Sequence, residues 1–364
     1  MPFYKLTALA VLALTRCALA YSEPRAYVIP SGQFDGTARA DEVVDKAAFD
    51  GPQVTVNNGS AYQWWYFDAV AQDSNATLVA QFYPGWFSES NAVLLNIVWP
   101  NGTSYANVIP VGDLQLTTIG EGSQGYVDSG SMSWFGASDL SVYHLTLDLP
   151  EAGVSGKITM RSRAPAHVAC GLRLPGASFE FAPYLYWANA VPDSYASVDL
   201  LVNGTELSFS GSGYHDQNWG TAPFASDLTQ WYWGHSSIGN YSLVYFYHID
   251  AELSVTASAY LSENGEPIIA SCASSVIEVA PQGANVTVPL ALGTDVERWL
   301  ISISDPIRGD FNFTVENMVM AADQEIYTRW VTKTTGGCIG CDSQTGTGII
   351  EWMNNPTLAL TADA

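Results

Sequence analysis

Short runs of β-branched and aromatic residues, separated by Gly, Pro, Asn, Asp and Ser, constrain the fold of this chain more than any other feature. They recur about every eight to twelve residues, a spacing typical of β-sandwiches and β-barrels. Helix signals are almost absent, so we expect an all-β fold. The runs predict strands at Tyr62–Ala69, Ala76–Phe82, Ala92–Trp99, Tyr143–Leu149, Gly156–Arg161, Ser197–Leu201, Leu228–His235, Ser242–Ile249 and Arg298–Ile303.

Two matched segments indicate two similar β-domains. Gln63-Trp-Trp-Tyr-Phe-Asp68 resembles Gln230-Trp-Tyr-Trp-Gly-His235, and each is followed by a glycosylation sequon and by an aliphatic and aromatic strand. Internal similarity of this kind is typical of repeated units. We therefore expect a signal peptide at 1–20, an irregular N-terminal arm at 21–60, an N-terminal β-domain at 61–195 and a C-terminal β-domain at 196–364.

The first twenty residues have the pattern of a secretion signal. Lys5 precedes an apolar run from Leu6 to Leu14, and the small residues Ala18 and Ala20 predict cleavage after Ala20. The apolar run is too short to span a bilayer, and no later stretch is long enough. We expect a secreted protein without a membrane span. An excess of Asn-x-Ser/Thr sequons supports passage through the secretory pathway; they predict glycosylation at Asn58, Asn75, Asn101, Asn203, Asn240, Asn285 and Asn312.

Four cysteines remain after loss of the signal peptide, an even number that favours disulfides in an oxidising compartment. They are Cys170, Cys272, Cys338 and Cys341, and the sequence leaves all three pairings open. For the CxxC pair Cys338 and Cys341 we favour a structural disulfide over a redox pair or half of a zinc site. No second CxxC motif or suitably spaced His pair accompanies it.

The segment from Gly211 to Gly220, Gly-Ser-Gly-Tyr-His-Asp-Gln-Asn-Trp-Gly, carries polar and aromatic residues on both faces of a predicted strand. Alternation places His215 and Trp219 on one face, and Asp216 and Asn218 on the other. A half-buried strand normally has one plain apolar face, so this composition indicates an enclosed and partly polar site. A purely structural role is the alternative.

Aromatic rows extend this candidate site. Alternation groups Trp231 with Trp233, and Tyr245 with Tyr247, and it groups Trp64 and Tyr66 with Asp68; whether each row lines a pocket or packs in the core stays open. No metal-ligand spacing, nucleophile elbow or phosphate loop is present. The remaining rings, amides and acidic candidates, Asp68, Asp216 and Glu351, suit chemistry directed by shape and hydrogen bonding, for which no cofactor or metal is required.

Two of these segments, Trp64-Trp-Tyr-Phe-Asp68 and Gly213-Tyr-His-Asp-Gln-Asn-Trp-Gly220, resemble signatures of the carotenoid 1,2-hydratase (hydroxyneurosporene synthase-like) superfamily. Tyr327-Thr-Arg-Trp330 and Gly348-Ile-Ile-Glu-Trp352 are similar to its closing strands. The resemblance implies two lipocalin-like antiparallel β-barrel or sandwich domains that enclose the substrate between them. The fungal branch of this superfamily includes Diels-Alderases and hetero-Diels-Alderases.

The resemblance also implies roles for the candidate residues. Trp231 and Trp233 would form a wall for the diene, and Tyr184 would donate a hydrogen bond opposite them. Asp68 and His215 would organise the interior or assist loss of water. The expected substrate contacts are Trp64, Tyr66, Tyr186, Asn218, Trp219, Tyr245, Tyr247, Glu351 and Trp352.

The expected function is a cofactor-free hetero-Diels-Alder reaction that joins an o-quinone methide to a terpene alkene such as humulene. The alternatives are a decalin-forming Diels-Alderase acting on a polyenoyl tetramic acid, a terpenoid hydratase or isomerase, and a non-catalytic lipocalin-like carrier. Gln217 stands where hydratase-like relatives often carry a second His, which argues against hydration there. The partner is then a small apolar polyketide or terpenoid, and the net charge of −23 argues against nucleic acid.

Overall fold

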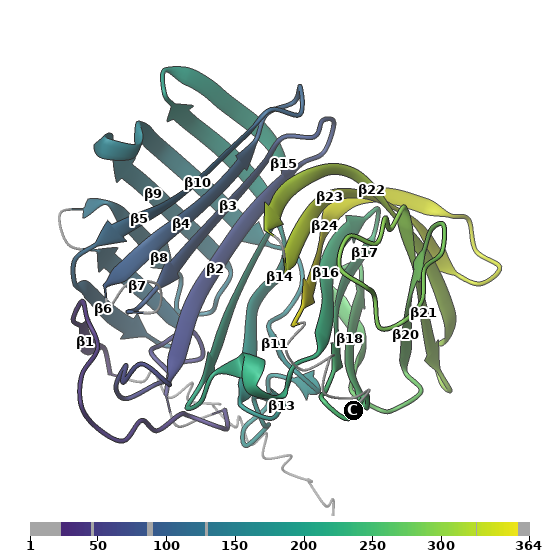
Figure 1. Cartoon of the computed structure of the whole chain (residues 1–364), viewed down its shortest axis with the longest axis horizontal. Helices are drawn as coiled ribbons and strands as arrows, with labels where there is room; N and C mark the ends of the chain where they lie inside the picture. Colours follow the sequence, from purple (N-terminus) through teal and green to yellow (C-terminus); the bar gives the residue numbers. More distant parts are fainter. Residues whose placement is uncertain (1–22, 45–46, 86–89, 128–129, 325, 356–364) are drawn as a thin grey trace, which may run out of the picture.

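The computed structural model describes residues 23–44, 47–85, 90–127, 130–324 and 326–355, and it is built from two antiparallel sheets that lie side by side (Figure 1). Among these residues there is no α-helix, and no helix long and apolar enough to cross a membrane. The all-β prediction is confirmed. The expected signal peptide lies outside the described residues.

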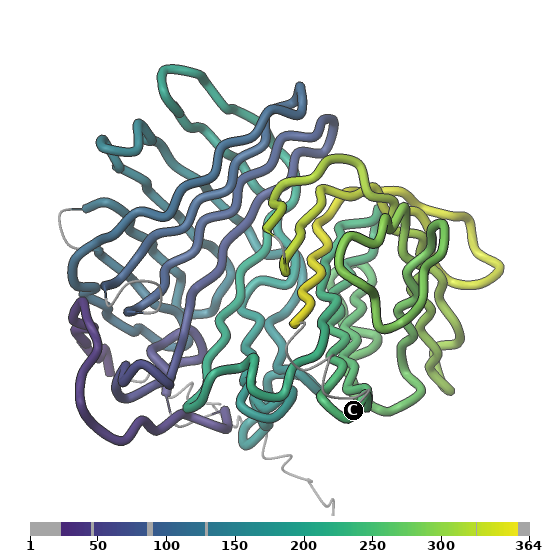
Figure 2. Tube along the Cα trace, in the orientation of Figure 1, coloured from purple at the N-terminus to yellow at the C-terminus, as the bar shows by residue number. Residues whose placement is uncertain are grey.

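The first sheet follows the order β1-β6-β7-β8-β9-β10-β14-β15-β2-β3-β4-β5, with three short strands attached beside β14. It curls around a large apolar core (Figure 2). Its strands are β1 (Arg25–Ile29), β2 (Tyr62–Ala71), β3 (Thr77–Tyr83), β4 (Asn91–Val98), β5 (Ser104–Val111), β6 (Leu114–Ile119), β7 (Gly122–Val127), β8 (Met132–Gly136), β9 (Val142–Leu149), β10 (Val154–Ser162), β11 (His167–Val168), β12 (Gly171–Leu172), β13 (Glu180–Ala182), β14 (Leu185–Val202) and β15 (Thr205–Gly220).

The second sheet follows the order β19-β18-β17-β16-β24-β23-β22-β21-β20 and has an apolar core of its own. Two short 3-10 helices, η2 (Pro150–Ala152) and η3 (Phe224–Asp227), complete the regular structure of the described chain. The strands of this sheet are β16 (Gln230–Ile238), β17 (Tyr241–Ile249), β18 (Val255–Glu263), β19 (Glu266–Ser271), β20 (Ile277–Gln282), β21 (Arg298–Asp305), β22 (Gly309–Gln324), β23 (Tyr327–Cys338) and β24 (Gln344–Asn354).

The burial of individual strands shows where the two sheets meet. In β9 buried and exposed residues alternate, as expected for a sheet that has one face on the core and one face exposed to solvent. In β2 all residues are buried: Trp65 and Phe67 enter the core of the first sheet, whereas Trp64 and Tyr66 enter a third apolar cluster between the sheets. The face of β2 that points away from its own core is therefore covered by the second sheet.

The change from one sheet to the other falls between Gly220 and Gln230, later than the expected boundary at 195/196. The reason is the long β14–β15 hairpin, whose strands pair on either side of the Asn203-Gly204 turn, with register shifts between Asn189 and Ser194, and whose second strand ends only at Gly220. Residues 196–220 thus belong to the first sheet, and the stretch from β1 to β15 is larger than its partner. Within the expected arm at 21–60, the residues that the structure describes are largely irregular, except for β1, which pairs with β6.

The two halves are joined by covalent and polar contacts. A disulfide links Cys170, beside the first sheet, to Cys272, after β19.

The CxxC cysteines also form a disulfide, Cys338–Cys341, as favoured from the sequence. None of the seven sequon asparagines is buried; their glycosylation stays a prediction.

Candidate functional site

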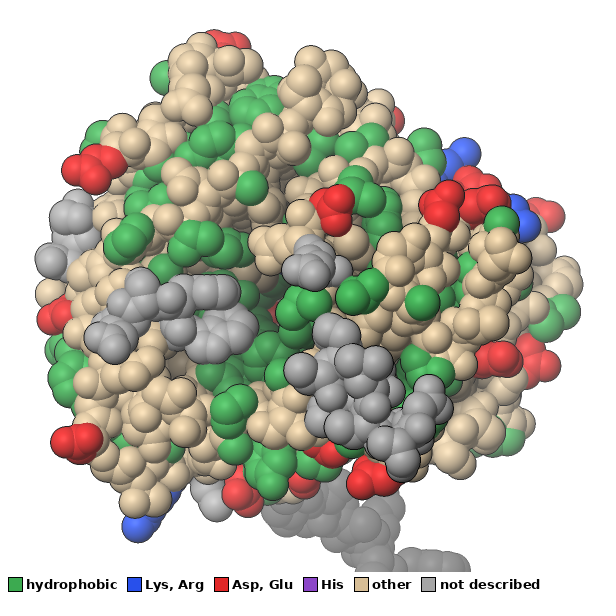
Figure 3. Space-filling view, viewed as in Figure 1, with side chains coloured by type: hydrophobic (Ala, Val, Ile, Leu, Met, Phe, Trp, Pro, Cys, Tyr) green, Lys and Arg blue, Asp and Glu red, His purple; other side chains and the backbone are tan. Residues whose placement is uncertain are grey.

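A cavity of about 450 Å³ lies between the two sheets. Figure 3 shows hydrophobic side chains gathered in the hollow between the two halves of the molecule. Strands β2, β3, β4 and β15 supply one wall, and β16, β17, β23 and β24 supply the other. The lining residues are Gly59, Ser60, Tyr62, Trp64, Tyr66, Gln81, Tyr83, Leu94, Asn96, Val108, Asp216, Asn218, Pro223, Phe224, Ala225, Trp231, Trp233, Phe246, Gln324, Ile326, Tyr327, Arg329, Glu351 and Met353.

Aromatic rings pack against one another along these walls. The Trp64 ring stacks on Tyr62 with centroids 5.2 Å apart, and Tyr66 meets Trp233 edge to face at 5.5 Å. Phe224, from η3, packs against Trp231 at 5.3 Å. Each ring is held by other rings, so the shape of the cavity is fixed by packing.

Asp216 is a buried carboxyl group in this lining. Its Oδ2 accepts hydrogen bonds from Trp187 Nε1 at 2.8 Å and from the Tyr214 hydroxyl at 2.7 Å, and its Oδ1 accepts one from Asn218 Nδ2 at 3.2 Å. Burial nevertheless dominates, because it disfavours the charged form, and it raises the pKa of Asp216 to about 7. This carboxyl group is therefore able to give and take a proton near neutral pH.

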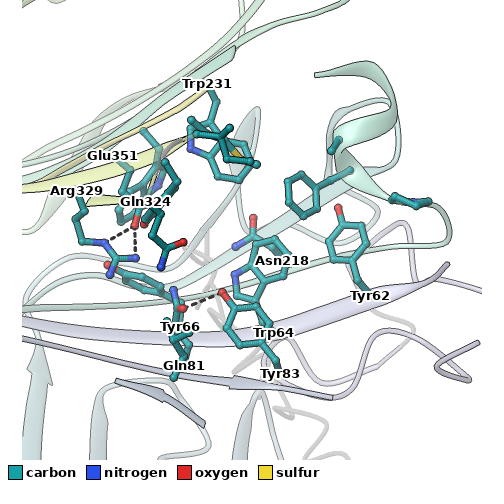
Figure 4. Close-up of a pocket in the computed structure, with 18 of the residues that line it drawn as sticks. Tyr62, Trp64, Tyr66, Gln81, Tyr83, Asn218, Trp231, Gln324, Arg329 and Glu351 are labelled. Atoms are coloured by element: carbon teal, nitrogen blue, oxygen red, sulfur yellow. Dashed lines mark hydrogen bonds and ion pairs between the residues drawn. The ribbon is translucent and has the colours of Figure 1, made fainter. Parts of the chain in front are cut away.

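Arg329 and Glu351 form a buried ion pair in the same cavity (Figure 4). Arg329 Nε donates to Glu351 Oε1 at 2.8 Å, and Nη2 lies 2.6 Å from the same oxygen. Arg329 Nη1 donates to Asn96 Oδ1 of the first sheet at 3.0 Å. The guanidinium also lies over the rings of Tyr66 and Tyr327, 5.5 and 5.4 Å from their centroids. A single side chain of β23 is thus fixed by both sheets.

Three donors of the lining residues are buried and lack a hydrogen-bond partner among the described residues: the Tyr66 hydroxyl, Trp231 Nε1 and Trp233 Nε1. Buried polar groups of native proteins are nearly always paired, so such orphans call for a ligand, a water or an ion. A carbonyl or ether oxygen held between the sheets would meet this need. In the same described part of the chain, no group of three or more His, Cys, Asp or Glu side chains is placed to hold a metal ion.

The structure brings seven of the sequence-predicted residues together in the lining: Trp64, Tyr66, Asp216, Asn218, Trp231, Trp233 and Glu351. They come from both sheets. The alternation expected from the sequence explains their placement, since each faces the cluster between the sheets while its neighbours along the strand face a core. What each does there remains a prediction.

Asp68 and His215 lie just outside the cavity. His235 Nε2 is 2.8 Å from Asp68 Oδ2, so Asp68 joins the two sheets. His215 points the other way, into the core of the first sheet, where its ring stacks on Phe67 at 3.9 Å and its Nε2 lies 3.0 Å from Asp50 Oδ1. His215 thus occupies the face of β15 opposite to Asp216 and lies outside the lining, which does not fit the expected part in loss of water; the expected part in organising the interior stays a prediction.

Six other expected residues also lie away from the lining. Tyr245 and Trp352 are in the core of the second sheet and Tyr247 packs against it, because Phe246 and Glu351 take the cavity-facing positions of their strands. The other three lie in the first half of the molecule and do not face the cavity. Trp219 is in the core of the first sheet, Tyr186 packs against that core, and Tyr184 is 48% exposed at a turn.

Sequence reasoning missed several lining residues, chiefly Arg329, Asn96 and Phe224. The available signal for Arg329 was a lone arginine on an otherwise aromatic and β-branched strand, in the segment Tyr327-Thr-Arg-Trp330. A charge at such a place is buried only with a partner. No local signal marks Asn96 or Phe224.

Comparisons with known proteins agree with this architecture. The quinolone epoxide rearrangement protein asqO of Emericella nidulans is 32% identical over 294 residues, which cover 77% of this chain and 80% of that protein. The quinolone epoxide rearrangement protein penF of Penicillium thymicola is 30% identical over 338 residues, covering 87% and 90%. The crystal structure of CghA with Sch210972 has the same fold, with a TM-score of 0.75 at 18% identity, over 90% of this chain and 98% of that one.

The model of the Diels-Alderase-like family matches residues 39–283. This match covers most of the first sheet and the beginning of the second, including the strands that carry Asp216, Trp231 and Trp233. The chain therefore belongs to the Diels-Alderase-like family, and it is an enzyme of the Diels-Alderase type.

Proposed function

We propose that this enzyme catalyses the acid-assisted isomerisation of an epoxide carried by an apolar, ring-containing substrate. The observation that carries the proposal is Asp216, a buried carboxyl group with a pKa of about 7 in the wall of a ring-lined cavity. A pericyclic reaction needs no acid, whereas epoxide opening is accelerated by one. The names of asqO and penF, which refer to rearrangement of a quinolone epoxide, support the same chemistry.

The step balances without any co-reactant. Protonated Asp216 gives its proton to the epoxide oxygen while one C–O bond breaks, and the electron pair of that bond goes to the oxygen. An electron pair from within the same molecule, of a hydroxyl group or of a migrating bond, forms the new bond to the electron-poor carbon. The proton released by this closure returns to the Asp216 carboxylate, so the product is an isomer of the substrate and the enzyme is restored.

The cavity favours capture within the substrate over capture by water. Its walls are formed mainly by rings, which hold a flexible substrate in a few compact shapes. Orientation of this kind can contribute several kcal/mol to a ring closure, and up to about 7–11 kcal/mol in ideal cases. The orphan donors of Tyr66, Trp231 and Trp233 could hold the oxygen atoms during the reaction.

A cycloaddition is the second candidate, and the aromatic residues in both walls of the cavity favour it. Trp64 and Tyr66 from one sheet and Trp231 and Trp233 from the other line the cavity, which suits a substrate with two π-systems. In this version a hydrogen bond from protonated Asp216 would polarise the carbonyl group of an o-quinone methide that adds to a terpene alkene such as humulene, or the carbonyl group of a polyenoyl tetramic acid that closes a decalin.

The test offers the purified protein three substrate types separately: a quinolone that carries an epoxide on an apolar side chain, a generated o-quinone methide with humulene, and a linear polyenoyl tetramic acid. Chiral chromatography and mass spectrometry compare each reaction with an uncatalysed control, in water enriched in ¹⁸O. We expect one enantiomer of an isomeric product from the epoxide, without ¹⁸O. Incorporation of ¹⁸O would instead indicate hydration. An unchanged epoxide, together with a single stereoisomer from either cycloaddition substrate, would establish the second candidate, and binding without conversion of any would indicate a carrier.

A further inference from the structure

The two ends of the cavity differ in chemistry. In the view of Figure 4, Arg329 and Glu351 lie at one end and Tyr62 at the other, with Trp64 and Asn218 between them. The first end also contains Asn96 and is the only part of the described lining that holds an ion pair. The second is lined by Phe224, whose ring packs against the rings of Tyr62 and Trp64. A substrate that fills the cavity must therefore have one polar end and one apolar end.

The polar end retains unused hydrogen-bonding capacity. A guanidinium group has five N–H donors, and the contacts of Arg329 with Glu351 and Asn96 use only three of them. Both arms of Arg329 meet the same carboxylate oxygen, Oε1 of Glu351, and a carboxylate accepts about four hydrogen bonds in all. The pair can thus still donate to an oxygen and accept from an N–H group.

The electrostatic balance restricts which ligand fits. Arg329 is neutralised by Glu351, so this end of the cavity carries no net positive charge. An anionic ligand would gain a contact with Arg329 but would also approach the Glu351 carboxylate, and both ions would have to be stripped of water. A neutral group with a donor and an acceptor on one planar edge avoids this conflict, and its flat ring fits beside the rings of Tyr66 and Tyr327.

We propose that the Arg329–Glu351 pair is a recognition site for the amide edge of a neutral cyclic amide, with Arg329 donating to the carbonyl oxygen and Glu351 accepting from the N–H group. Asn96 positions Arg329 for this contact. The inference rests on the proposed function for the place of the substrate in the cavity, and it specifies which end of the substrate binds where. The reacting, apolar part would then extend past Asp216 toward Phe224.

Binding of three flat probes to the full-length protein tests this site without any turnover. The probes are quinolin-2(1H)-one, its N-methyl derivative, which lacks the donor, and naphthalene-2-carboxylate, which is anionic. Isothermal titration calorimetry gives a dissociation constant for each. We expect quinolin-2(1H)-one to bind about tenfold tighter than either of the others, the discrimination usual when a hydrogen bond to a charged group is lost.

Variants test whether the preference for quinolin-2(1H)-one depends on the Arg329–Glu351 ion pair. Removing one partner of a buried pair leaves an uncompensated charge, whereas replacing both partners with apolar residues of similar size is often neutral for folding. The informative variant is therefore the double substitution Arg329→Met/Glu351→Leu, in which the preference should fall below about threefold. Arg173→Met is the matched control: Arg173 pairs with Glu121 at 3.5 Å on the surface, and the three dissociation constants should not change.

Phe224→Ala provides a second control, because it alters the opposite end of the cavity, which the probes do not reach, and it should leave the preference for quinolin-2(1H)-one unchanged. Three outcomes would overturn the inference: equal affinities of the wild-type protein for the three probes, no binding of any probe, or a preference for quinolin-2(1H)-one that survives in a correctly folded double variant. This binding test is independent of the test of the proposed reaction. If the enzyme left the epoxide unchanged, the acid chemistry would be refuted, but the measured binding preference would still stand.

Discussion

Replacing Asp216 with Asn should remove the fall in rate on the alkaline side of the pH–rate profile. A single acid with a pKa of about 7 falls from about 91% protonated at pH 6 to about 9% at pH 8, so wild-type turnover of the epoxide should fall about tenfold over this range. The Asn side chain has the same shape, and its oxygen can still accept hydrogen bonds from Tyr214 and Trp187. We expect turnover to be lower by a factor of about 10² to 10⁴, the usual contribution of a general acid, and to be independent of pH between 6 and 8.

The same substitution has a calculable effect on stability. The pKa of Asp216 is raised from an ordinary value of 3.8 to about 7, so the folded protein retains this proton more strongly than the unfolded chain. The corresponding stability, about 4 kcal/mol, is fully present below pH 3.8 and is lost as the pH rises toward 7. Urea unfolding of wild type and Asp216→Asn at pH 5 and pH 8 should therefore show a relative gain for the variant of about 3 kcal/mol at the higher pH.

A second substitution separates acid catalysis from a merely structural role. The Tyr214 hydroxyl donates to Asp216 Oδ2 and holds its pKa lower than burial alone would. Tyr214→Phe should shift the inflection of the pH–rate profile to higher pH while the enzyme stays active. If Asp216→Asn retains an inflection near pH 7, or if Tyr214→Phe leaves the inflection in place, another group supplies the proton and the reasoning fails.

Two further predictions concern the stability of the fold. The Cys170–Cys272 disulfide joins cysteines 102 residues apart in the sequence, and the Cys338–Cys341 disulfide joins cysteines 3 residues apart. If a disulfide stabilises by lowering the entropy of the unfolded chain, replacing both cysteines with Ser should lower the free energy of unfolding by about 4.7 kcal/mol for the first and about 1.6 kcal/mol for the second. Equal losses in urea titrations would contradict this account. Burial lowers the pKa of His167 from 6.5 to about 4, so about 3 kcal/mol of stability, present above pH 6.5, should be lost as the pH falls to 4. His167→Phe should abolish this loss, and an unchanged acid transition would show that other groups cause it.

The sequence was sufficient for the fold class and for most of the strands it assigned. The alternation of side chains marks β2, β3, β4 and β17 to within about two residues. It does so because successive side chains of a strand point to opposite faces of the sheet, a pattern that is visible in the sequence alone. It was not sufficient for the sheet boundary. The β14–β15 hairpin continues through Pro192, close to the boundary expected at 195/196, and the strand pairing absorbs that irregularity as shifts of register.

The site was predictable only in part, for a related reason. Alternation states correctly that Trp231 and Trp233 share a face, as do Tyr245 and Tyr247, but it does not state which face meets the other sheet. Choosing between those faces requires the pairing of strands that are far apart in the chain. The contact of Asn96 with Arg329, which spans 233 residues, illustrates the limit.

The residues behind the cavity explain why a polar motif can belong to the core and still matter for the site. His215 Nδ1 lies 2.8 Å from the backbone oxygen of Tyr66, and a carbonyl oxygen only accepts, so this nitrogen carries a proton. The other nitrogen contacts Asp50, which is fixed in turn by the hydroxyl groups of Tyr143 and Ser123. His215 therefore ties β2 to the buried arm segment while remaining out of reach of the substrate. Since Tyr66 lines the cavity and Asp216 follows His215 directly, a shift of this imidazole would move two residues of the same wall, so we expect His215 to act on the site by positioning that wall.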